Sequence, residues 1–67
     1  MKKFECFVYL SHERGRAPFY ICRTMVDDRR SLRALLRKFC FIHSAAVGCV
    51  VCDDIVWHYI NGIFYRD

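Results

Sequence analysis

The 67-residue sequence has no long uncharged segment, no internal repeat and no low-complexity stretch. Its longest run without a formal charge, residues 39–52, is well short of the ~20 apolar residues that a bilayer-spanning helix needs. The N-terminal Lys2 and Lys3 lead into an alternating segment rather than an apolar block, so we expect no secretory leader. Three glycines and one proline leave no linker, and the length allows a single compact domain, residues 1–67.

Motifs for enzymatic chemistry are also missing. The chain has no glycine-rich phosphate-binding loop and no G-x-S-x-G nucleophile elbow. Its three histidines and five cysteines offer the residue types for a Cys–His pair, but nothing in the sequence places any two of them together. A core this small also leaves little room for a cleft of ~300 Å³ or more. We therefore expect a non-enzymatic protein without catalytic residues or a cofactor.

The cysteines argue for a reducing environment rather than a disulfide framework. They are odd in number and lie in apolar segments, which favours a cytoplasmic protein. Two pairs have zinc-ligand spacing, Cys40-x-x-His43 and Cys49-x-x-Cys52. The second pair encloses two valines, and positions i and i+3 of a strand point to opposite faces. Buried reduced thiols are therefore favoured, no metal site is expected, and zinc is the alternative.

Hydrophobic periodicity predicts an α+β fold. Alternation at period two indicates strands over residues 3–10 and 17–26, joined by a polar connection of hairpin length. After a helical segment, short strands follow at residues 48–51, 55–60 and 63–66. We expect a ββαβββ order, with an antiparallel sheet of four to five strands and one helix packed on one face.

The helical segment spans residues 29–43. Asp27-Asp28 offers an N-cap at its start, and Asn61-Gly62 is typical of a type I′ turn between the last two strands. The expected apolar stripe of the helix comprises Leu32, Leu35, Leu36, Phe39 and Ile42, with Cys40 at its edge and His43 near its centre.

One helix can cover only one face of such a sheet, and both faces of the expected strands carry bulky apolar residues. In the first strand both alternating sets are apolar, so the sequence leaves open which face the helix covers. We expect Tyr20, Trp57 and Tyr59 to form a sheet-face interface with a partner or a second copy. The alternative is that sheet twist and long side chains hide most of this surface.

Positive charge gathers in the first part of the chain, with a net +6 over residues 1–38 against −2 over residues 39–67. The expected helix places cations opposite its apolar stripe and an aromatic ring among them, giving a candidate partner-binding set of Arg30, Arg33, Arg37, Lys38 and Phe41. Arginines and aromatic residues dominate the energetics of protein interfaces. The alternatives are a solvated charged face, or a helix that ends near Phe39 and lets Phe41 turn inward.

These features favour a protein-interaction module, an accessory or inhibitory protein that occludes an acidic or nucleic-acid-binding surface of a partner. In size and layout the chain is similar to phage or prophage counter-defence proteins such as anti-CRISPR inhibitors, a likeness of architecture that assigns no residue. The alternative is a small basic nucleic-acid-binding protein, since arginines suit phosphates and aromatic strands suit base stacking. A homodimer through the sheet is compatible with either function, and no membrane association is expected.

Overall fold

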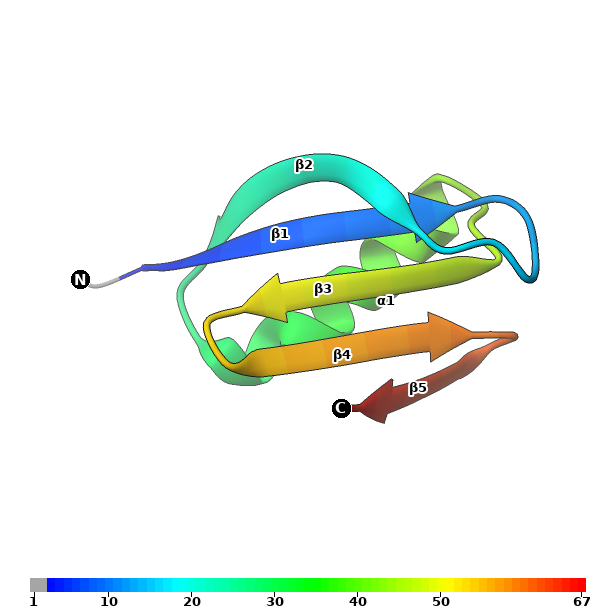
Figure 1. The fold of residues 1–67 in the computed structure, drawn as a ribbon. Helices are drawn as coiled ribbons and strands as arrows, with labels where there is room; N and C mark the ends of the chain where they lie inside the picture. The colour runs from blue at the N-terminus through cyan, green and yellow to red at the C-terminus, as the bar shows by residue number, and fades with distance from the viewer. Residues whose placement is uncertain (1–2) are drawn as a thin grey trace.

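The computed structural model describes residues 3–67 as an antiparallel sheet with one helix packed behind it (Figure 1). The elements in chain order are β1 (Phe4–Ser11), β2 (Phe19–Val26), the 3₁₀-helix η1 (Arg29–Ser31), α1 (Leu32–Ile42), β3 (Val47–Cys52), β4 (Ile55–Ile60) and β5 (Ile63–Arg66). The strand order across the sheet is β2-β1-β3-β4-β5, and each neighbouring pair is antiparallel. The predicted α+β architecture and ββαβββ order are confirmed.

Local polar chemistry sets both ends of the helical segment. At its start, Asp28 accepts a hydrogen bond from the backbone N–H of Arg30 at 2.9 Å, which satisfies a donor that the first turn leaves unpaired. At its end, Ser44 adopts a positive φ of 52°, and the Ala45 N–H donates to the Cys40 carbonyl at 2.9 Å. Because α1 continues to Ile42, the alternative of a helix ending near Phe39 is wrong.

The helix covers the sheet face that carries Cys6, Val8 and Leu10 of β1. Cross-strand pairing adds Val50 of β3 to this face, and all four side chains are at most 2 % exposed. The opposite alternation, which carries Glu5 as well as the bulky Phe7 and Tyr9, faces away from the helix. The structure thus settles a choice that the sequence left open.

The buried stripe of α1 is centred differently from the predicted one. Leu32 and Leu36 are fully buried as expected, and Cys40, which was placed at the edge of the stripe, is only 4 % exposed. By contrast, Ile42 is 60 % exposed, and His43, which was expected near the centre of the stripe in the core or at the helix end, lies exposed at the C-cap. At 100° per residue, Ile42 lies about 120° around the helix from Leu36, which takes it away from the sheet.

Two short turns order the C-terminal half. Asn61 and Gly62 have φ values of 51° and 84°, so the predicted type I′ turn joins β4 and β5. Asp53, with φ 54°, lies in the tight turn between β3 and β4. No helix within residues 3–67 is long and apolar enough to cross a membrane.

Candidate partner-binding surfaces

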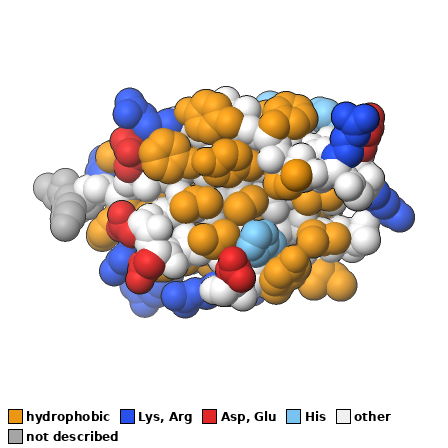
Figure 2. Space-filling view, in the orientation of Figure 1, with side chains coloured by type: hydrophobic (Ala, Val, Ile, Leu, Met, Phe, Trp, Pro, Cys, Tyr) orange, Lys and Arg blue, Asp and Glu red, His pale blue; other side chains and the backbone are white. Residues whose placement is uncertain are grey.

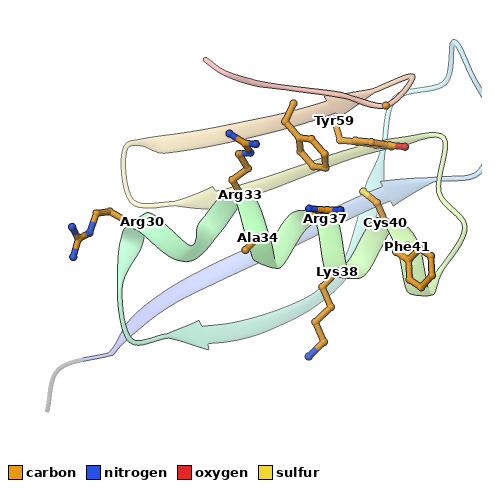
Figure 3. Close-up of a pocket in the computed structure, with 10 residues that line it drawn as sticks. Arg30, Arg33, Ala34, Arg37, Lys38, Cys40, Phe41 and Tyr59 are labelled. Atoms are coloured by element: carbon orange, nitrogen blue, oxygen red, sulfur yellow. The ribbon is translucent and has the colours of Figure 1, made fainter.

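A groove of about 910 Å³ lies between α1 and the β4–β5 hairpin (Figure 3), so the expectation that so small a protein leaves little room for a cleft is wrong. The five cationic and aromatic residues expected to bind a partner all line it, namely Arg30, Arg33, Arg37, Lys38 and Phe41. Its opposite wall comes from the hairpin, with Tyr59, Gly62 and Phe64. We call this the basic groove. Sequence reasoning did not identify the hairpin wall, because β-strand pairing brings it beside the helix from about twenty residues further along the chain.

Phe41 is the most unusual side chain of the basic groove, since it is 85 % exposed. It lies on the last turn of α1, about 140° around the helix from Leu36, where the helix cannot turn it inward. An exposed ring of this size gains little in the free protein, because its apolar surface stays in water. A function in binding would account for an aromatic residue at this position.

The cations of the basic groove differ in whether they are already paired. The Arg30 guanidinium contacts the Asp28 carboxylate at 3.0 Å, and this interaction holds the pKa of Asp28 below its usual value. Arg33, Arg37 and Lys38 have no ion pair with any carboxylate in the described part of the chain.

The orientations of these cations separate them further. Arg33 and Arg37 lie on the side of α1 toward the hairpin, whereas Arg30 and Lys38 extend away from it (Figure 3). The Arg33 guanidinium carbon is 6.0 Å from the centre of the Phe64 ring, a cation–π arrangement that holds the positive charge in the groove. Arg33 and Arg37 are therefore the cations best placed to meet an anionic ligand.

The sheet face opposite the helix forms a second surface, which we call the open face. Hydrophobic side chains cover most of it (Figure 2), and no element in residues 3–67 packs over it. The strand register assigns to it Phe7, Tyr9, Tyr20, Cys49, Val51, Val56, Ile60, Ile63 and Tyr65. The expectation that one sheet face keeps an uncovered apolar surface is confirmed.

Of the three residues expected at a sheet-face interface, only Tyr20 lies on the open face. A β-bulge shifts the β1–β2 register between Val8 and Tyr9, so Tyr20 pairs with Tyr9, their rings 5.9 Å apart in an edge-on arrangement. Trp57 and Tyr59 pair across the sheet with Val50 and Gly48, which places them on the helix-covered face against the core. The expectation that the three share one interface is corrected accordingly.

The two pairs with zinc-ligand spacing, Cys40/His43 and Cys49/Cys52, do not converge in space. Cys40 is buried while His43 is exposed, and Cys49 lies on the open face while Cys52 is buried on the other. Among residues 3–67 there is no group of three or more His, Cys, Asp or Glu side chains arranged to hold a metal ion.

Burial also suppresses the nucleophilicity of the core thiols. It raises the pKa of Cys6 to about 12, with a further contribution from neighbouring Cys52, and that of Cys40 to about 11. A thiol is a nucleophile only as its thiolate, so these two cysteines are unreactive at neutral pH while the protein is folded.

Comparison with known proteins adds no family to these surfaces. No protein-family model matches the chain, and no curated protein and no solved structure shows significant similarity to it. The basic groove and the open face are therefore interpreted from the geometry of this chain alone.

Proposed function

We propose that the protein is a non-enzymatic interaction module that binds an acidic surface of a partner protein through the basic groove. It acts as an accessory or inhibitory protein by occluding that surface. The observation that carries the proposal is Phe41, 85 % exposed in a groove that also holds the unpaired cations Arg33 and Arg37. An aromatic anchor limits dissociation, and the surrounding positive charge steers an acidic partner into register.

The walls of the groove support a ligand with both anionic and apolar groups. Arg33 and Arg37 provide positive charge on the helix side, and Tyr59 and Phe64 provide aromatic surface on the hairpin side. A partner segment with an aromatic or aliphatic side chain between Asp or Glu residues would match both walls. Burying carboxylates beside guanidinium groups is favourable only when the pairs form charge-assisted hydrogen bonds, which arginine supplies in bidentate geometry.

A displayed peptide library tests this proposal. The wild-type protein is expected to enrich sequences in which acidic residues flank an apolar anchor. Arg33→Glu/Arg37→Glu should lose these peptides, and so should Phe41→Ser. Arg14→Glu/Arg16→Glu makes the same change of charge in the exposed β1–β2 connection and should retain them. Retention of the selected peptides by both groove variants would exclude the basic groove as the binding site.

A second function, nucleic-acid binding, is favoured by the same unpaired cations beside the exposed ring of Phe41. Phosphates would meet Arg33, Arg37 and Lys38, and a base would stack on Phe41, worth ~1–3 kcal/mol per stacked base. Salt separates the two functions. Binding to single-stranded DNA or RNA weakens by orders of magnitude as salt rises, because each neutralised phosphate releases a counterion. Binding of an acidic peptide anchored by an aromatic residue should weaken much less.

A further inference from the structure

We infer that the open face is the contact surface for a second copy of this chain, and that two copies pack sheet against sheet with their helices outside. This inference concerns the side of the sheet away from the basic groove and does not depend on the proposed function. The centre of the face is largely apolar, with the partly exposed Phe7 and Tyr9 on β1, Val51 on β3 and Val56 on β4, and His58 of β4 lies among them beside Cys49. An exposed apolar patch of several hundred Å² often marks an interaction surface.

The size of the open face is sufficient for a dimer. Five strands about 4.8 Å apart, with roughly six residues of about 3.3 Å each, give a face of about 20 by 24 Å. That corresponds to about 500 Å² in projection and more once side-chain relief is counted. Two copies therefore bury about 1,200 Å² in total, which reaches the lower end of stable specific interfaces.

Charge also favours a second copy as the occupant. On the open face Arg23 contacts Glu5 at 3.2 Å, so these two charges are compensated within each copy, and the imidazole of His58 contacts the Asp67 carboxylate at 3.5 Å. Arg33, Arg37 and Lys38, which form no ion pair within residues 3–67, lie on α1, on the other side of the sheet. Face-to-face packing thus separates the two basic helices, and the net charge of +4 per chain opposes association only weakly.

The symmetry of such a dimer identifies the residues near its axis. A two-fold interface brings the same patch of both copies together, and face-packed sheets lie about 10 Å apart. Because β3 is the central strand of the five, its outward residues Cys49 and Val51 lie closest to the two-fold axis. The opposed copies therefore cover Cys49, while Cys22, which pairs with Val8 on the helix-covered face, keeps its environment.

These two cysteines provide a test in the unmodified protein. Both are partly exposed in the single chain, whereas the other three cysteines are buried. Alkylation with iodoacetamide is followed for each cysteine by mass spectrometry at protein concentrations from about 1 µM to about 1 mM, a range that spans the dissociation constants of weak dimers. The expected result is at least a tenfold slowing at Cys49 as concentration rises, with the rate at Cys22 unchanged.

Sedimentation equilibrium supplies the second measurement. Wild type should approach twice the chain mass of 8.0 kDa as concentration rises. Val51→Lys, which places a charge at the two-fold axis, should remain a monomer and lose the protection of Cys49. Ala17→Lys adds the same charge at an exposed position before β2 and should dimerise as wild type does.

Three outcomes would overturn the inference. The first is a monomer at every concentration with constant alkylation of Cys49. The second is a ladder of larger species in place of a dimer, which would indicate unspecific association. The third is protection of Cys49 that appears only when cell extract is added, because a different protein would then cover the open face. Since none of these measurements involves the basic groove, their failure leaves the proposed function standing, and failure of the peptide selection leaves the dimer standing.

Discussion

The Sγ atom of Cys40 in α1 lies directly over Gly48 in β3, and a Cβ atom added at Gly48 would come within 2.7 Å of it. Leu10 and Leu36 approach the same point to 3.1 Å. Glycine is therefore required here by space and not by backbone conformation. This contact fixes how closely the helix approaches the sheet, and with it the width of the basic groove beside the helix.

Gly48→Ala should destabilise the protein by about 1–3 kcal/mol, because the added methyl overpacks the helix–sheet contact. Unfolding in urea, followed by circular dichroism, measures the change. Cys40→Ala removes the closest atom, so the double variant should be more stable than the sum of the two single changes predicts. Cys22→Ala, on another strand, should combine additively with Gly48→Ala. If Gly48→Ala showed the same coupling energy with Cys40→Ala as with Cys22→Ala, the contact between Cys40 and Gly48 would be contradicted.

The position of the buried stripe on α1 leads to a second prediction. Leu36→Ala should cost about 2–5 kcal/mol, since Leu36 is fully buried and its truncation leaves a cavity. Ile42→Ala should change the free energy of unfolding by less than about 0.5 kcal/mol, because Ile42 is 60 % exposed. Urea unfolding of the two variants is the measurement. A comparable loss of stability in both would favour the broader stripe expected from periodicity.

The strands and the helix were predictable because their apolar residues repeat at periods of 2 and 3.6, and Asp28 and Asn61-Gly62 mark their ends. The covered face was not predictable, since both alternations of β1 carry bulky apolar residues. A bulge between ladder pairs leaves no mark in the pattern, and it moved Tyr20 to the open face. Trp57 and Tyr59 were assigned to the wrong sheet face. Which residues of β4 share a face with which residues of β1 depends on how both strands pair with β3, and the sequence does not give that register.

The candidate site was predictable on the side of the helix and not on the side of the sheet. The cations and Phe41 come from one continuous helical segment, so their common face follows from helical geometry. Phe64 and Gly62 line the same groove only because the paired strands β4 and β5 lie beside the helix. Hydrophobic periodicity does not encode this tertiary relationship. Gly48 was a usable signal in hindsight, since a glycine within a strand often marks close approach of another element.

The buried thiols predict a loss of stability at alkaline pH. The pKa of Cys40 rises from its ordinary value of 9.0 to about 11 on folding, so the unfolded chain releases this proton first as pH increases. The contribution of the Cys40 thiol to the free energy of unfolding is therefore complete below pH 9.0 and is lost between pH 9.0 and about pH 11. Over this range the free energy of unfolding falls by at most about 1.4 kcal/mol per pH unit because of this group. The free energy of unfolding, measured in urea at intervals from pH 7 to pH 11, should fall accordingly.

Matched cysteine variants isolate this effect from other groups that titrate at high pH. Cys40→Ala should show a shallower decline above pH 9 than wild type, because its thiol no longer contributes. Cys22→Ala is the matched control, because it removes a partly buried cysteine on another strand, away from the helix contact. Parallel curves for wild type and Cys40→Ala would show that the thiol ionises equally in both states.

Phe41 allows the folding and binding contributions of α1 to be separated. Phe41→Ser should leave the free energy of unfolding within about 0.5 kcal/mol of wild type, because the ring makes almost no contact in the free chain. Phe39→Ser is the matched control two residues earlier. Phe39 packs against the core and stacks on His43 with the ring centres 6.1 Å apart, so its loss should destabilise the protein by about 2–4 kcal/mol.

The two phenylalanine variants are then compared for binding of the acidic peptides selected by wild type. A stable Phe41→Ser protein that binds at least tenfold more weakly assigns the ring to the interface, since tenfold corresponds to about 1.4 kcal/mol of binding free energy. If Phe41→Ser instead unfolds as readily as Phe39→Ser, the ring supports the fold, and the basic groove loses the anchor on which the proposed function depends.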